Sequence, residues 1–320
     1  MLSRFPTADS QKASVHLKVP VTYYPVKALL YCWSLLPMPV LHLQASVLAW
    51  LLFRVLGYRR KVVLDNLRQS FPEKTESEIQ RIAKGFYLNL SDVVMESLKL
   101  LSMSAANLKR RVRHVNPEVI GEMVAHGGGG IAIFGHFANW EWLGAGMGLH
   151  LPFGTVGVYK TQSSRLADAL MLHIRCRLGN EMITMEQTYR ESLTRLQKPC
   201  YIAFLGDQVP NPQPKLYFTP LLGRPAAVQL GIATICLKMN VPLYYFDIRR
   251  EKRGHYAVTL RKVQHEDLLP YSKENSYTLT DRHVAMLEEI IRANPTDWLW
   301  SHRRWKRKPQ EDSILSKKLQ

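Results

Sequence analysis

Residues 28–53 form a stretch of 26 positions, "ALLYCWSLLPMPVLHLQASVLAWLLF", in which no side chain is formally charged at neutral pH. Because roughly 20 apolar residues span the hydrocarbon core of a bilayer, this stretch is long enough to cross one. Pro37 and Pro39 weaken the case for one continuous spanning helix, since proline removes a backbone donor and interrupts a helix. The alternative is a kinked pair of helices, Val26–Leu36 and Val40–Leu56, that lies in the membrane interface.

The residues around this stretch favour a membrane segment over a buried core hairpin. Basic and aromatic side chains concentrate at membrane interfaces. Those near the stretch are Lys18, Lys27, Arg54, Arg59, Arg60, Lys61, Tyr23, Tyr24, Trp33 and Trp50. The stretch begins late and has no clear small-residue cleavage site, unlike a signal peptide. We therefore expect a polar N-terminal tail at 1–22 and a membrane-anchoring helical segment at 23–60.

The chain carries 43 Lys and Arg against 26 Asp and Glu, a net charge of +17. So basic a surface suits an anionic partner, such as a nucleic acid, anionic lipid headgroups or an acidic carrier protein. The apolar segment favours the membrane over a nucleic acid. Four scattered cysteines form no CxxC pair and have no histidine at zinc spacing, so we expect reduced, mostly buried thiols and no metal site.

The pattern after the apolar segment predicts an α/β fold. Thr75 and Glu78 have the spacing of a capping box and open a helix that continues to about residue 101. From about residue 110, short apolar runs alternate with helical patterns. Strands are expected at 129–135, 154–159, 200–206, 241–250 and 255–263, and helices from about 139 and at 164–179, 226–240 and 278–295.

This alternation predicts a mostly parallel sheet flanked by helices. The catalytic domain is expected at 61–310, followed by a polar C-terminal tail at 311–320. The charged "EKRG" at 251–254 is read as a hairpin turn, and the alternating 255–263 as an edge strand.

One short block, "GHFANWEW" at 135–142, combines a histidine and a carboxylate at a strand–helix junction. His136 follows a buried strand, so its imidazole is expected at the carboxyl edge of the sheet, where open α/β folds place their sites. Glu141 falls near the start of the following helix. The pair is expected to meet there, with Glu141 holding one ring nitrogen while the other accepts a proton.

With its flanks, this block resembles the His-x4-Asp/Glu motif of the glycerolipid and lipid A acyltransferases. It is most similar to the late acyltransferases of lipid A biosynthesis. Further resemblances follow in family order: "NLRQSFPE" (66–73), "VYKTQSSRLADALMLHIRCRLG" (158–179), "FLGDQVP" (204–210) and "WLWSHRRWKRK" (298–308). The chain departs from many relatives at "QSSR" (162–165), which leaves the identity of the acceptor open.

The resemblance implies a role for each matching residue. His136 would be the general base on an acceptor hydroxyl, and Glu141 would orient it. Arg175 would bind a phosphate or the oxyanion of the tetrahedral intermediate, with a surface ion pair as the alternative. Asp207 would position the acceptor or Arg175, or cap a loop. The implied substrate contacts are Lys160, Arg177, Gln208, Arg303 and Arg304.

The implied reaction needs no cofactor and takes its acyl group from acyl carrier protein, with coenzyme A as the less favoured alternative. Its partners would be that carrier, a lipid A precursor and the anionic cytoplasmic face of the bacterial inner membrane. Two alternatives stay open: a phospholipid or aminolipid acceptor, and a non-catalytic scaffold that binds membranes with the same fold.

Overall fold

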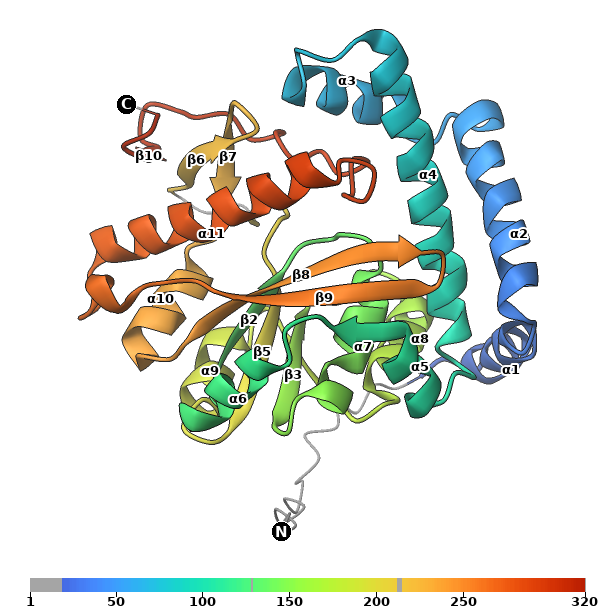
Figure 1. The fold of residues 1–320 in the computed structure, drawn as a ribbon, viewed down its shortest axis with the longest axis horizontal. Coiled ribbons are helices and arrows are strands. Elements are labelled where there is room, and N and C mark those ends of the chain that lie inside the picture. The colour runs from blue at the N-terminus through green and yellow to red at the C-terminus, as the bar shows by residue number, and fades with distance from the viewer. Residues whose placement is uncertain (1–18, 128, 212–214, 320) are drawn as a thin grey trace.

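The computed structural model describes residues 19–127, 129–211 and 215–319, and the first 18 residues of the expected N-terminal tail lie outside these ranges. Within them the chain forms a mixed α/β fold with one large and one small sheet (Figure 1). The helices are α1 (Tyr23–Ser34), α2 (Met38–Trp50) with its π-helical continuation η1 (Leu51–Val55), α3 (Arg60–Ser70), α4 (Glu76–Lys99), α5 (Ala105–Arg111), α6 (Glu118–Ala125), α7 (Trp140–His150), α8 (Arg165–Cys176), α9 (Thr188–Arg195), α10 (Gly231–Met239), the 3-10 turn η2 (Glu266–Leu268) and α11 (Lys273–Ala293). The strands are β1 (Val112–His114), β2 (Gly130–Phe134), β3 (Gly154–Tyr159), β4 (Glu181–Thr184), β5 (Cys200–Leu205), β6 (Tyr217–Leu221), β7 (Arg224–Val228), β8 (Leu243–Lys252), β9 (His255–Lys262) and β10 (Ile314–Leu315).

The large sheet has the strand order β1-β9-β8-β2-β5-β3-β4 among the described residues. Strands β8, β2, β5, β3 and β4 run parallel to one another, and in the described part of this sheet only the β8–β9 hairpin is antiparallel. The expected mostly parallel sheet is therefore confirmed. Side chains alternate across β2: Phe134 faces Gly144 of α7, whereas Ile133 lies beside Ile232 of α10. Helices thus cover both faces of the sheet.

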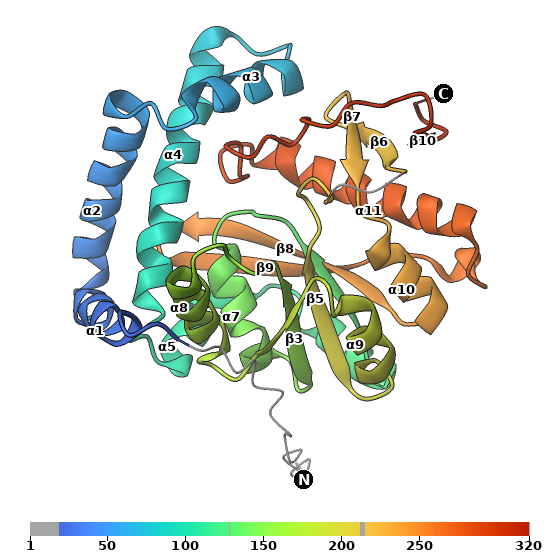
Figure 2. The same cartoon turned by 180° about the vertical axis from the view of Figure 1, so that it is seen from behind.

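Helices α1, α2 and α4 lie outside the layers formed by the large sheet and the helices on its two faces. Helix α4 lies beside the β8–β9 hairpin, and α2 packs on the far side of α4 (Figures 1 and 2). The expected kinked pair is present, with a break between Ser34 and Met38. The segment Met38–Val55 has the length and apolar composition of a membrane-crossing helix, and 28% of it is buried in the protein.

Several local predictions are confirmed. Thr75 accepts a hydrogen bond from the backbone of Glu78, and the Glu78 side chain accepts one from the backbone of Thr75, so the capping box is complete. Strand β3 has the predicted bounds, and β2 and β5 match within a residue at each end. The predicted hairpin turn at "EKRG" is confirmed, with Arg253 and Gly254 between β8 and β9.

Other predictions are wrong. Strand β9 is not at the edge of the sheet, because β1 pairs with its outer side. Residues 226–228 belong to β7 rather than to the following helix, which begins at Gly231. Ile314 and Leu315, expected in a polar tail, pair with β6. All four cysteines are free, but only Cys200 and Cys236 are buried, whereas Cys32 and Cys176 are exposed.

Candidate active site

The register of two neighbouring parallel strands brings His136 and Asp207 together. Phe134 of β2 is opposite Leu205 of β5, so the residues two positions further along each chain leave the sheet at the same level. His136 Nδ1 lies 2.7 Å from Asp207 Oδ1, and the backbone N–H of His136 donates to Asp207 Oδ2 at 2.8 Å. The carboxylate that orients the imidazole therefore comes from the adjacent strand.

Asp207 is buried and held in its ionised form. Burial raises its pKa, but the charge of His136 and hydrogen bonds from His136 and Trp298 outweigh burial and lower this pKa to about 2. Trp298 Nε1 donates to Asp207 Oδ2 at 2.9 Å. Because an ionised carboxylate only accepts hydrogen bonds, His136 carries its proton on Nδ1 in the neutral state. Its Nε2 then presents a lone pair, as a general base requires.

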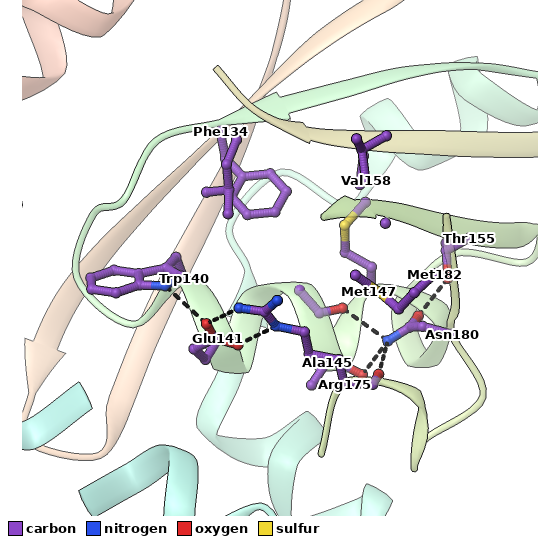
Figure 3. Close-up of a pocket in the computed structure, with 14 residues that line it drawn as sticks. Phe134, Trp140, Glu141, Ala145, Met147, Thr155, Val158, Arg175, Asn180 and Met182 are labelled. Atoms are coloured by element: carbon purple, nitrogen blue, oxygen red, sulfur yellow. Dashed lines mark hydrogen bonds and ion pairs between the residues drawn. The ribbon is translucent and has the colours of Figure 1, made fainter. Parts of the chain in front are cut away.

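The expected hydrogen bond between Glu141 and His136 is not formed in this structure. Glu141 lies in the first turn of α7, and both of its oxygens bind Arg175 of α8, at 2.9 Å from Nε and 2.6 Å from Nη2 (Figure 3). Trp140 Nε1 also donates to Glu141 at 3.2 Å. Although burial raises the pKa of Glu141, the Arg175 guanidinium lowers it below its ordinary value. Glu141 pairs with arginine because a fixed guanidinium fork satisfies both of its oxygens.

A tight turn positions His136 between β2 and α7. Ala138 adopts a left-handed backbone with φ of 44°, and Asn139 caps α7 by accepting a hydrogen bond from the backbone N–H of Trp142 at 2.8 Å. The turn is also bonded to the 297–299 segment. The backbone N–H of Leu299 donates to the carbonyl of His136 at 3.1 Å, and that of Ala138 to the carbonyl of Asp297 at 3.0 Å.

A buried polar stripe on α4 supports this turn from behind. Asn89, Asp92 and Glu96 recur at spacings of three and four, which places them on one helix face. Glu96 accepts from Asn139 Nδ2 at 2.5 Å and from the hydroxyl of Tyr256 at 2.6 Å, and it also bonds His42 Nε2 at 2.9 Å. The carboxylate therefore links the turn that follows His136 to β9 and to α2.

Asp92 and Asn89 bind the β8–β9 hairpin in the same way. Arg250 donates to Asp92 at 2.7 Å and also to Asn89, and Arg253 donates to Asp92 and to the carbonyl of His42. Arg253 of the "EKRG" turn therefore joins the β8–β9 hairpin to α2 and to α4, so the turn is more than a solvated hairpin tip.

A mainly apolar cavity opens beside the Glu141–Arg175 pair (Figure 3). Its volume is about 50 Å³. Its lining residues are Phe134, Trp140, Glu141, Gly144, Ala145, Met147, Thr155, Gly157, Val158, Arg175, Asn180, Met182, Ala203 and Leu205. At one end Asn180 accepts from the hydroxyl of Thr155 at 2.5 Å and donates to the carbonyls of Gly144 and Ala145 at 2.9 and 2.8 Å. The cavity therefore has a charged end near Trp140 and an amide end at Asn180.

The sequence matches the family described as bacterial lipid A biosynthesis acyltransferase over residues 10–307. The chain belongs to this family. It is also similar to a lipid A biosynthesis lauroyltransferase of Escherichia coli (strain K12), with 23% identity over 281 residues that cover 86% of this chain and 88% of the relative. Both findings support an acyltransferase, so the geometry around His136 belongs to an enzyme of this kind.

The other substrate contacts expected in this acyltransferase lie at varying depth. Lys160 and Arg303 are exposed, and Lys160 Nζ lies 3.5 Å from the side-chain oxygen of Asn211. Arg177 donates to the carbonyl of Met103. Gln208 contacts His136 Nε2 at 3.2 Å. Arg304 is 1% exposed and donates to the carbonyl of Ala227 at 2.8 Å, and its contact with a phosphate stays a prediction.

Sequence reasoning missed Trp298, Asn139 and Glu96 as parts of the acyltransferase site. Trp298 stood inside a block that resembles the family, but its bond to Asp207 spans 91 positions. Glu96 carried a local signal, since it continues the Asn89–Asp92 spacing on the buried side of α4. Among the described residues, no group of three or more His, Cys, Asp or Glu side chains is arranged to hold a metal ion.

Proposed function

We propose that this acyltransferase moves a fatty acyl chain from an acyl thioester to a hydroxyl of a lipid A precursor, with His136 as the general base and Asp207 as its orienting carboxylate. The observation that carries the proposal is the way in which the two ring nitrogens of His136 are oriented. Its Nδ1 is fixed by Asp207 at 2.7 Å, and its Nε2 faces away from that carboxylate. This is the arrangement of a Ser-His-Asp triad in which the substrate's own hydroxyl replaces serine.

The reaction proceeds in two steps. His136 Nε2 takes the proton of the acceptor hydroxyl while the hydroxyl oxygen forms a bond to the thioester carbonyl carbon. The tetrahedral intermediate then collapses, the carbon–sulfur bond breaks, and the thiolate takes the proton back from His136. Protons and electron pairs balance between hydroxyl, imidazole and thiol, so the step consumes no cofactor. Asp207 stabilises the imidazolium between the two steps.

Arg175 is the group best placed to stabilise the negative oxygen of the intermediate. Its Nε and Nη2 bind Glu141, which fixes the guanidinium plane at the charged end of the cavity. Its side chain keeps 22% of its surface exposed, so Nη1 remains available to an incoming oxygen. Glu141 then acts as the positioning residue for Arg175.

The apolar part of the cavity would take the acyl chain. Phe134, Val158 and Leu205 line it with apolar side chains, and Met147 and Met182 add apolar side chains that are flexible. The cavity, of about 50 Å³, would have to widen as a long acyl chain enters, and the flexible side chains of Met147 and Met182 are suited to that adjustment.

Exposed apolar side chains on the N-terminal helices support membrane docking. Leu29, Leu43, Val47, Trp50 and Leu56 each expose more than half of their surface, a concentration that monomeric soluble proteins rarely show. The same segment carries basic residues that suit anionic headgroups. It would place the enzyme on the cytoplasmic face of the bacterial inner membrane.

Docking through these helices would also bring the lipid acceptor near the site. Tyr23 of α1 packs on Ala169 and Leu170 of α8, and α8 carries Arg175. A hydroxyl at the membrane surface would thus approach the charged end of the cavity along α8. The exposed cations Lys160 and Arg303 are candidate contacts for the acceptor's phosphate.

The proposed donor is acyl carrier protein, whose acidic surface suits the net charge of +17, and coenzyme A, which is also anionic, is the alternative that the assay must compare with it. A phospholipid or aminolipid acceptor is the second candidate, because the chain departs from the pattern of many relatives at 162–165, directly at the start of α8. The complete His136–Asp207–Trp298 arrangement argues against a non-catalytic scaffold.

The test is an acyl-transfer assay with membranes that contain the full chain. Radiolabelled acyl-carrier protein and acyl-coenzyme A are each supplied with lipid A precursor or phospholipid, and products are identified by mass spectrometry. We expect acylated lipid A precursor with the wild type and none with His136→Ala, although both should fractionate with membranes. Near-normal transfer by His136→Ala would contradict the proposed mechanism.

A further inference from the structure

The side-chain amide of Gln208 contacts His136 Nε2, the nitrogen that would accept the proton in the proposed reaction. Gln208 Nε2 is 3.2 Å from His136 Nε2. Since Asp207 fixes the imidazole proton on Nδ1, the His136 Nε2 atom is the acceptor in this contact and the Gln208 amide is the donor. The lone pair that would take a proton from a hydroxyl is therefore already engaged.

The backbone on both sides of Gln208 is held in place. The N–H of Gly206 donates to the carbonyl of Phe134 at 3.0 Å, and Asp207 binds His136 through its side chain. The N–H of Val209 donates to His302 Nε2 at 3.3 Å. Uncovering His136 Nε2 therefore requires rotation of the Gln208 side chain and no movement of its backbone.

The rest of the His136 ring is largely enclosed. Its side chain is 14% exposed, and the Trp140 ring packs edge-on against it with centroids 5.2 Å apart. Asp207 covers the Nδ1 side. Of the described side chains, Gln208 is the one that hydrogen-bonds the reactive nitrogen, so it decides what reaches that atom.

We propose that Gln208 is a specificity-determining gate that keeps water from His136 Nε2 until an acceptor hydroxyl displaces its amide. This inference rests on the proposed function of His136 as the base. Without the gate, water would replace the acceptor. The water oxygen would bond to the acyl carbon, the carbon–sulfur bond would break, and the thiolate would take the proton held by His136. An acceptor with further contacts to the enzyme can displace the amide, whereas a single water gains little by doing so.

The first test compares hydrolysis with transfer in purified full-length protein. Gln208→Ala removes the amide, and Gln208→Leu removes the donor while nearly keeping the volume. Both should raise thiol release from acyl-carrier protein in the absence of acceptor about five-fold, the factor that corresponds to a net hydrogen bond of about 1 kcal/mol. The KM for the acceptor should fall by a similar factor.

Gln264→Ala is the matched control, since this exposed glutamine lies outside the site and should leave both reactions unchanged. Unchanged hydrolysis in both Gln208 variants would overturn the gate. So would a higher acceptor KM, which is the result expected of a direct substrate contact. A rise with alanine but not with leucine would overturn the hydrogen-bonded gate as well.

A second test does not depend on activity. Diethyl pyrocarbonate attacks the free lone pair of an imidazole, and peptide mapping by mass spectrometry follows each histidine separately. Gln208→Ala should increase the modification rate of His136 several-fold but leave that of the exposed His126 unchanged. An unchanged His136 rate would overturn the gate. Failure of the wild type to acylate lipid would instead overturn the proposed function, and the modification rates would still decide the gate.

Discussion

Two buried carboxylates flank His136, and they differ in how they are supplied and what they bind. Asp207 comes from the neighbouring strand, 71 positions away, and binds the imidazole directly. Glu141 comes from the helix that follows His136 and binds Arg175. Both carboxylates are kept ionised, one by a histidine and one by an arginine.

In the proposed mechanism this difference separates two tasks. The Asp207 end would hold the tautomer of the base, and the Glu141 end would hold a cation for the developing oxyanion. A carboxylate close to His136 in the sequence is therefore not necessarily the one that hydrogen-bonds its imidazole. In a parallel sheet, the residue at the same level on the next strand lies nearer.

The largest effect is expected from Asp207→Asn. An asparagine amide can donate to Nδ1 of His136 and so favour the wrong tautomer, and we expect kcat to fall about 10³- to 10⁴-fold. Glu141→Gln is the matched control, with the same change from carboxylate to amide at the other end. Steady-state kinetics should show a smaller fall for Glu141→Gln, and the reverse order would contradict the assignment of Asp207 as the orienting residue.

The next largest effect concerns folding stability. Glu141→Gln leaves the largely buried Arg175 without its anion, and we expect a loss of about 2–3 kcal/mol, less than for a fully buried pair because Arg175 stays 22% exposed. Urea unfolding in detergent would measure it. In the double variant Glu141→Gln/Arg175→Met the loss should be smaller than the sum of the two single losses, and strict additivity would refute the pair's coupling.

Acid should weaken the Asp207 end in a defined range. The pKa of Asp207 falls from 3.8 to about 2 in the folded protein, so its ionisation stabilises the fold above pH 3.8. This contribution, about 2 kcal/mol, is lost as the pH falls from about 4 towards 2. When the melting temperature is measured against pH, its decrease between pH 4 and pH 2 should be smaller for Asp207→Asn than for the wild type. An identical decrease in both proteins would mean that Asp207 is not held ionised.

The smallest effect is expected at the helix cap that begins the Glu141 end. Asn139→Ala removes the cap of α7, and we expect a loss of about 1 kcal/mol. Asn139→Ser keeps a capping oxygen but not the donor to Glu96, so its loss should be smaller. Equal losses, measured by chemical unfolding, would show that the bond to Glu96 matters more than the cap.

The sequence predicted the framework of this protein better than its contacts. Runs such as "GTVGVY" and the capping box at Thr75 are local signals, and the structure confirms both. The edge position assigned to 255–263 failed because β1 is only three residues long and leaves almost no pattern. His136 and Asp207 were both singled out as site residues, but their mutual bond depends on strand order, which spacing along the chain does not encode.

The expected hydrogen bond between Glu141 and His136 is missing for a related reason. A carboxylate in the first turn of a helix has several neighbours in space, and the choice between His136 and Arg175 depends on where α8 packs. The burial of Arg304 was equally hidden, because a run of basic residues in a chain of net charge +17 reads as surface.

Helix α4 joins α2 to the turn that follows His136 as a single helix of 24 residues, about 36 Å at 1.5 Å per residue. Near its carboxyl end, Glu96 bonds His42 of α2 on one side and Asn139 on the other. With α2 docked on a bilayer as proposed, this helix would hold His136 at a set height above the lipid. Acceptors would then be sorted by the depth of their hydroxyl as well as by its chemistry, and a hydroxyl carried too deep or too high would stay out of reach.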